Sequence, residues 1–150
     1  MQGRLVFLSR FPERKKPAIV ENCLQLTAGM GIVGDFHGDG NDNQISIMTK
    51  ELKDWMDSQE VQGHCFRRFK ENILIEGISL ENCTPGDFLV CDEVVLEITD
   101  FVKRCYPEIC DFSELGIPCI VPDGIRYARV VHGGELKTGR PIMIKKRKEN

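Results

Sequence analysis

A turn, a strand, a tight reversal and a second strand follow one another in residues 84–99, Thr84-Pro85-Gly86-Asp87-Phe88-Leu89-Val90-Cys91-Asp92-Glu93-Val94-Val95-Leu96-Glu97-Ile98-Thr99. Proline followed by glycine at the centre of the first four residues is what a type II turn requires. The apolar runs on either side of Asp92 favour strands, and Asp92 itself indicates a tight reversal. Glu97 alternates with apolar neighbours, so its side chain is expected to point away from a core.

Five further runs have the same strand-like composition, at 5–8, 45–48, 72–75, 127–131 and 141–144. In the second of them, Ser46 alternates with isoleucines and is also expected to point away from a core. The convincing helix candidate is 49–59, because Thr49 can cap it and Leu52, Trp55 and Met56 share one face. A short helical turn is expected at 111–115. Many short strands and so little helix predict a mostly β (α+β) fold, a compact and largely antiparallel barrel.

Length and composition indicate a single soluble domain. The chain has 150 residues, 41% of them hydrophobic and 29% charged, which predicts one domain over 1–150 with a core at about 5–144 and a solvated basic tail at 145–150. No run approaches the roughly 18 apolar residues of a membrane span. The start of the chain does not resemble an export signal, so a cytoplasmic protein without membrane attachment is expected. The net charge of −3 argues against a nucleic-acid partner.

Seven cysteines are an odd number for a disulfide framework, so reduced thiols are expected. Zinc is weakly signalled, because there is no C-x-x-C pair and the histidines are not at ligand spacing. Cys105 stands out, since Lys103 and Arg104 precede it directly and adjacent positive charge stabilises the reactive thiolate. It also follows a strand, where a loop can present a reactive group. From the local sequence alone, a reactive Cys105 and a Cys105 that merely packs as a small apolar residue are about equally supported.

Three polar blocks carry further candidate residues. The glycine-rich block at 31–40 contains Asp35 and His37, and its glycines can let the backbone come close to a ligand. The alternative interpretation is a tight loop between two strands, with Asp35 in an Asx turn. Asn72, at the start of a strand, can contact a heterocycle edge or cap the neighbouring loop. Arg126 and Arg129 are three residues apart in a strand, so they are expected on opposite faces and one of them can face a pocket.

These blocks, in this order, resemble the MOSC domain, the C-terminal module of molybdenum-cofactor sulfurases, which also occurs as a small stand-alone protein. The resemblance covers residues 5–144. It rests on Gly31-Ile32-Val33-Gly34-Asp35-Phe36-His37, Gln44-Ile45-Ser46, Glu71-Asn72-Ile73, Glu76-Gly77-Ile78, Pro85-Gly86-Asp87, Leu96-Glu97-Ile98-Thr99, Cys105 with Cys110, Tyr127-Ala128-Arg129-Val130 and Gly133-Gly134.

The resemblance implies a closed antiparallel β-barrel of MOSC type that binds molybdenum cofactor, a molybdopterin, or carries sulfur toward it. Cys105 matches the family's sulfur carrier or metal ligand, and Cys110 is a rival for that role or a partner that resolves an oxidised Cys105. We expect Lys103, Arg104 and Arg129 to anchor the cofactor phosphate, with His37, Asn72 and Asp35 in its pocket.

Pyridoxal phosphate is expected only through a partner, because the larger family members carry it on a separate desulfurase domain. A desulfurase, a molybdoenzyme or a reductase are the implied partners. The alternatives to a carrier are a molybdenum-dependent reductase of N-hydroxylated compounds and a barrel that only mediates protein contacts.

Overall fold

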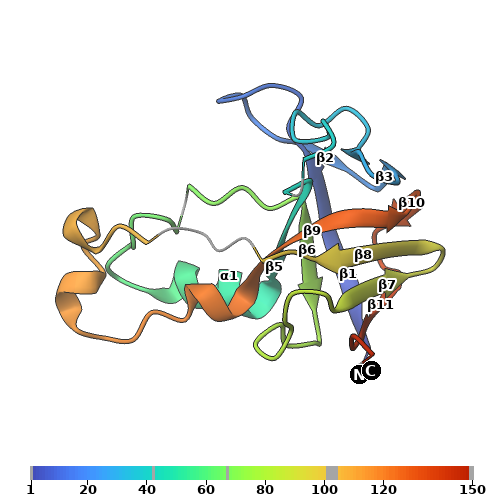
Figure 1. Cartoon of the computed structure of the whole chain (residues 1–150). Helices are drawn as coiled ribbons and strands as arrows, with labels where there is room; N and C mark the ends of the chain where they lie inside the picture. The colour runs from blue at the N-terminus through green and yellow to red at the C-terminus, as the bar shows by residue number, and fades with distance from the viewer. Residues whose placement is uncertain (1, 42, 67, 101–104, 149–150) are drawn as a thin grey trace.

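The computed structural model describes residues 2–41, 43–66, 68–100 and 105–148. Seven strands of this part of the chain close into a barrel: β1 (Gln2–Arg10), β11 (Pro141–Lys145), β7 (Phe88–Cys91), β8 (Val94–Ile98), β9 (Ile125–His132), β5 (Ile45–Thr49) and β6 (Ile73–Glu76), which pairs back to β1 (Figure 1). Adjacent strands of the ring are antiparallel except for β5 and β6. The predicted mostly β, closed barrel is therefore confirmed, with one parallel pair that was not expected.

The turn and hairpin expected at 84–99 are present. Gly86 has φ +93° and the Asp87 N–H donates to the Thr84 carbonyl over 3.0 Å, as in a type II turn. Cys91 and Val94 face each other across the reversal, and Asp92 adopts φ +52° there. Aspartate tolerates this left-handed conformation better than most residues, which suits it to a two-residue connection.

The helix α1 (Lys50–Ser58) begins directly after β5 and belongs to the crossover that the parallel β5–β6 pair requires. The Thr49 hydroxyl caps it by accepting from the Leu52 N–H over 3.2 Å, as predicted. Three short 3-10 helices, η1 (Pro107–Ile109), η2 (Ser113–Leu115) and η3 (Val121–Gly124), lie between β8 and β9, and η2 falls in the predicted helical turn. In the described ranges, no helix has the length and apolar content needed to cross a membrane.

Two apolar clusters stabilise the structure. One fills the barrel, and the other lies outside it between α1, the outer face of β5 and β6, and the 105–125 excursion, with Met48, Leu52, Met56, Phe66, Phe69, Leu74, Phe112, Val121 and Ile125. Figure 1 shows α1 and this excursion together on one side of the barrel. Ser46 points out of the barrel as expected, but it is only 8% exposed. The barrel core covers one face of β5 and the outer cluster covers the other, so the whole strand is buried.

Four short strands were not anticipated. A second sheet contains β10 (Gly134–Lys137), β3 (Cys23–Thr27) and β4 (Gly31–Ile32), and β2 (Ile19–Glu21) extends the barrel sheet beyond β1. The glycine-rich block at 31–40, interpreted above as a loop, therefore begins with a strand. Leu24, Leu26, Ile32 and Leu136 from this second sheet join the barrel core. The sheet closes one end of the barrel interior.

The C-terminal tail folds back onto the barrel as far as Arg147, where a solvated end was expected. The Asp87 carboxylate accepts from the Lys146 ammonium and the Arg147 N–H over 2.9 Å each, and from the Thr84 N–H over 2.9 Å. Burial alone would raise the pKa of Asp87, but these hydrogen bonds outweigh it and lower the pKa from 3.8 to about 2. Asp87 thus holds the turn before β7 to the end of β11.

We expect Asp87→Asn to lower the free energy of unfolding at neutral pH by about 2 kcal/mol, because it removes charge-assisted hydrogen bonds. The pKa is depressed in the folded state, so this stabilisation is present above about pH 4 and is lost as the pH falls toward about 2. Urea unfolding followed by the fluorescence of Trp55 measures both effects. Asp57→Asn, at an exposed position of α1, is the matched control. Equal stability of the Asp87→Asn variant and the wild type across this range would contradict the assignment.

Candidate functional site

A cavity of about 430 Å³ opens where β8 ends and β9 begins, and Cys105 lies in its wall. Four of the seven cysteines of the chain contribute to it. The surrounding surface is mostly apolar. The described lining residues are Cys65, Glu81, Cys83, Thr84, Pro85, Ile98, Thr99, Asp100, Cys105, Cys119, Val121, Pro122, Ile125, Arg126 and Tyr127. A cavity of this size falls within the range of small-molecule sites.

Cys105 is solvent-exposed and is a free thiol. It is the first described residue after 101–104, so the expected phosphate anchors Lys103 and Arg104 lie outside the described residues. Cys105 enters the cavity from the 105–125 excursion, which runs from β8 to β9 and also supplies Cys119, Val121 and Pro122. The position predicted from local sequence as the reactive one therefore opens onto a ligand-sized space.

The other cavity thiols differ from Cys105 in their surroundings. Burial raises the pKa of Cys83, and Asp87 adds to the effect while Arg126 opposes it. Burial also raises the pKa of Cys119, whose sulfur accepts a hydrogen bond from the Val121 N–H. These two sulfurs are consequently held mainly as thiols at neutral pH.

Cys110, the rival of Cys105, is half-buried against the outer apolar cluster and is not among the described residues that line the cavity. Its sulfur accepts a hydrogen bond from the His64 N–H over 3.3 Å. Across the described ranges, no group of three or more His, Cys, Asp or Glu side chains is arranged to hold a metal ion.

Arg126 forms the polar wall of the cavity and holds its sides together. Its Nε donates to the Cys83 carbonyl over 3.0 Å, and Nη2 donates to the carbonyls of Leu80 over 2.7 Å and Glu81 over 3.3 Å. Nη1 donates to the carbonyls of Pro122 and Ile125 over 2.7 and 2.6 Å. All five N–H groups of the guanidinium are thus used on backbone carbonyls.

The positive charge of Arg126 has no carboxylate within salt-bridge distance in the described part of the chain. Tyr127, its neighbour in β9, also lines the cavity, and burial raises the pKa of its hydroxyl to about 12. The cavity thus combines four cysteines, apolar walls, the Arg126 cation and the carboxylates of Glu81 and Asp100. Arg126 favours an anionic or thiolate group there, and the two carboxylates oppose it.

Arg129 lies on the other face of β9, as the three-residue spacing predicts. It donates to both carboxylate oxygens of Glu97 over 3.0 and 3.1 Å, and it is not among the described residues that line the cavity. Arg126, not Arg129, therefore faces the pocket. Sequence alone could not choose between them, because the carbonyls that hold Arg126 come from Leu80 and Cys83, which are distant in the sequence.

The structure brings Asp35, His37 and Asn72 together, but outside the described lining of the Cys105 cavity. The Asn72 amide donates to Asp35 Oδ1 over 3.1 Å, and its oxygen accepts from Ser46 N–H over 3.0 Å. The Asp35 carboxylate also accepts from the Phe11 N–H over 2.7 Å and the His37 N–H over 3.0 Å. The buried Asp35 and Asn72 side chains thus tie the glycine-rich block to β1, β5 and β6.

This polar network is nevertheless close to the cavity. Ser46 pairs with Tyr127 across β5 and β9, so their side chains share the outer face of the barrel. The Phe69 ring contacts the Tyr127 ring with 5.9 Å between centroids. Asp35 and Asn72 are therefore placed to position a strand next to the cavity wall.

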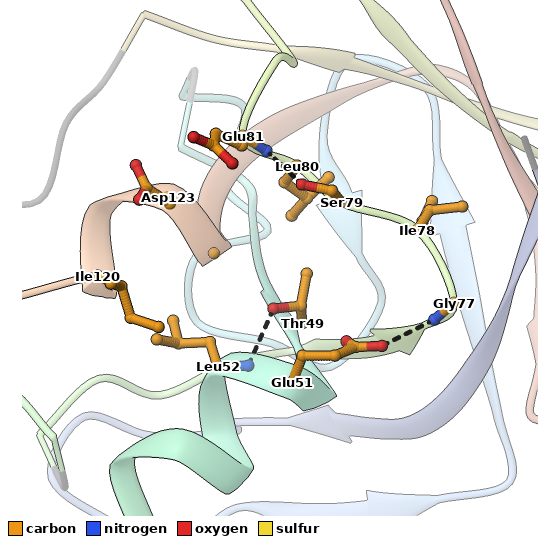
Figure 2. Close-up of a pocket in the computed structure, with 11 residues that line it drawn as sticks. Thr49, Glu51, Leu52, Gly77, Ile78, Ser79, Leu80, Glu81, Ile120 and Asp123 are labelled. Atoms are coloured by element: carbon orange, nitrogen blue, oxygen red, sulfur yellow. Dashed lines mark hydrogen bonds between the residues drawn. The ribbon is translucent and has the colours of Figure 1, made fainter.

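Another cavity, of about 520 Å³, lies across the Leu80–Glu81 segment and η3 from the Cys105 cavity. Figure 2 shows the carboxylates of Glu51, Glu81 and Asp123 around it, with Glu51 accepting from the Gly77 N–H. No basic residue is among the described residues that line it. The Cys105 cavity also has carboxylates, those of Glu81 and Asp100, but it adds Arg126 and four cysteines, so it is the candidate site.

Comparisons with known proteins agree with the barrel. The YuaD protein of Bacillus subtilis aligns with a TM-score of 0.73 at 16% identity, covering 99% of this chain and 98% of that one. The YiiM protein of Escherichia coli aligns with a TM-score of 0.64 at 18% identity, covering 100% of this chain and 72% of that one. At these identities the likeness shows the fold alone.

No curated protein matches the sequence significantly. The MOSC domain family, however, matches residues 34–143, which is most of the chain and includes the cavity residues and residues 34–40 of the glycine-rich block. The chain therefore belongs to the MOSC domain family.

Proposed function

We propose that this MOSC domain handles molybdenum cofactor in the cytoplasm, with Cys105 as the thiol that carries sulfur or binds the metal. The observation that carries the proposal is that Cys105 lies in the wall of a cavity bounded by Arg126. A reactive thiol that opens onto a ligand-sized, mostly apolar space differs from one that only packs in a core.

The residues present suit such a cofactor. A thiolate is a soft ligand that matches sulfur and soft metal chemistry. The apolar walls, with Ile98 and Tyr127, suit a flat heterocycle. The Arg126 charge favours an anion without offering it a free N–H, and the carboxylates of Glu81 and Asp100 in the same wall oppose it. Lys103 and Arg104 remain the proposed phosphate anchors. Arg129 is less suited, because it is paired with Glu97 on the opposite face of β9.

His37, Asn72 and Asp35 enter this proposal as positioning residues. Asn72 and Asp35 form hydrogen bonds with backbone groups and with each other. Their proposed role is therefore to hold the backbone next to Tyr127 in place. When bound, the cofactor would supply the metal centre that accepts sulfur. The chain itself supplies the thiol, the cation and the apolar walls.

Sulfur carriage through Cys105 balances without an added oxidant. The Cys105 thiolate attacks the terminal sulfur of a persulfide on a donor protein, the donor S–S bond breaks, and the donor leaves as a thiolate. The extra sulfur then resides on Cys105 as a persulfide. A pyridoxal-phosphate desulfurase is the proposed donor and a molybdoenzyme the proposed recipient. A reductase partner would instead fit the molybdenum-dependent reduction of N-hydroxylated compounds.

The test compares wild type with Cys105→Ser in cells that make the cofactor and receive molybdate. We expect the variant to lose bound molybdenum and pterin, and to lose persulfide, because a serine hydroxyl is a harder ligand and does not ionise near neutral pH. Metal analysis, pterin fluorescence after oxidation and intact-mass measurement provide the three readouts. Circular dichroism checks that the fold is unchanged.

Cys23→Ser is the matched control, since Cys23 is also exposed but lies in β3, away from the cavity. Loss of all three readouts in both variants would contradict a specific role for Cys105. Retention of cofactor and persulfide by Cys105→Ser would contradict the proposal itself. Turnover of an N-hydroxylated compound with an artificial electron donor would assign the reductase alternative.

Limiting alkylation at neutral pH should label Cys105 first. Cys83 and Cys91 are buried, and burial raises the pKa of both, that of Cys91 to about 11. Peptide mapping by mass spectrometry gives the order of labelling. Labelling of Cys23 or Cys83 ahead of Cys105 would contradict the assignment of Cys105 as the reactive thiol.

A further inference from the structure

We propose that Cys119 is the thiol that discharges sulfur from Cys105, and that the cavity works as a dithiol rather than as a single carrier. The inference rests on the proposed function. It adds Cys119 as a second reacting residue and hydrosulfide, released into the cavity, as the product. The observation behind it is that the exposed thiols of Cys105 and Cys119 line the same cavity of about 430 Å³.

Cys105 and Cys119 come from the two ends of one excursion, which leaves the barrel after β8 and returns to η3. Cys105 lies before η1, and Cys119 lies two residues before η3. Negative charge on Cys105 raises the pKa of Cys119, and so does negative charge on Cys110, so both sulfurs lie within electrostatic range of Cys119. The shared cavity is what distinguishes Cys105 from Cys110. The excursion therefore folds so that its ends present both thiols to one space.

The surroundings of Cys119 suit the discharge of a persulfide from Cys105 better than the first attack on an external sulfur donor. The Val121 N–H donates to its sulfur and orients it, while burial keeps it mainly as a thiol at neutral pH. It is thus a poor first nucleophile for a sulfur donor. Once a persulfide forms on Cys105, however, attack by Cys119 is intramolecular, and proximity compensates for the small thiolate fraction.

Cys110 is less suited to this step, although it is closer to Cys105 in the sequence. Its sulfur accepts from the His64 N–H and packs against the outer apolar cluster. It is also not among the described residues of the cavity wall. Cys65 and Cys83 do line the cavity, but neither is exposed.

The step balances in atoms and electrons. The Cys119 thiolate attacks the inner sulfur of the Cys105 persulfide, a Cys105–Cys119 bond forms, and the outer sulfur leaves as hydrosulfide. The two cysteine sulfurs are oxidised to the disulfide and the outer sulfur is reduced to sulfide. An external dithiol then reduces the disulfide and restores both thiols. The hydrosulfide is an anion that leaves beside Arg126, inside the cavity where an acceptor would be bound.

The experiment loads purified protein with sodium polysulfide, removes the excess, and follows sulfide release in thiol-free buffer. We expect wild type to release sulfide and to form a Cys105–Cys119 disulfide, mapped by mass spectrometry. Cys119→Ser should retain the persulfide on Cys105 and release sulfide at least about tenfold more slowly, because the intramolecular nucleophile is gone. Cys119→Ala checks that the serine hydroxyl plays no part.

Cys110→Ser is the matched control and should release sulfide at the wild-type rate. Equal release by Cys119→Ser and wild type, or a disulfide that joins Cys105 to Cys110, would overturn this inference and leave sulfur carriage by Cys105 intact. Failure of Cys119→Ser to hold any persulfide on Cys105, together with wild type that releases no sulfide, would instead remove sulfur carriage itself, and this inference with it. The two failures are therefore distinguishable.

Discussion

The five hydrogen bonds of the Arg126 guanidinium are the interaction on which the site depends. They join the start of β9 to the 80–83 segment on one side and to η3 on the other. Both segments contribute to the wall of the Cys105 cavity and to that of the acidic cavity of Figure 2. A planar group with five fixed donors suits this task, and lysine could not replace it. The same contacts leave Arg126 without a carboxylate at salt-bridge distance in the described ranges, so the residue that builds the cavity also brings a positive charge to it, beside Glu81 and Asp100.

The barrel supplies the rigid support for this arrangement. The parallel β5–β6 pair requires a crossover, and the crossover contributes α1 and part of the outer apolar cluster. That cluster anchors the 105–125 excursion through Phe112 and Val121, so the segment that carries Cys105 and Cys119 is packed against β5 and β6. The Asp35–Asn72 network then holds the glycine-rich block against β5, one strand away from Tyr127. Local packing outside the barrel, rather than the barrel interior, brings the thiols together.

Much of the fold could be predicted because its signals are local. The Pro-Gly turn, the alternation around Glu97 and the Thr49 cap each depend on neighbouring residues, and each is present. Leu24 and Leu26 alternate in the same way, but β3 contains one β-branched residue and no aromatic one, so its composition does not stand out as a strand. The site was harder to predict. Cys105 could be singled out from its charged neighbours, but Cys119 and Arg126 enter the site through tertiary packing. Asn72 and Asp35 looked like ligand contacts because buried structural amides and carboxylates use the same chemical groups.

The central claim is that sulfur or metal is held on Cys105, inside the cavity that Arg126 builds. A crystal structure of protein from cells supplied with molybdate tests it most directly, with anomalous scattering used to locate molybdenum and sulfur. The account predicts an anomalous signal bonded to Cys105 Sγ, either from the metal or from an added sulfur atom. A signal on Cys83, or one in the cavity lined by Glu51 and Asp123, with Cys105 unmodified, would contradict it.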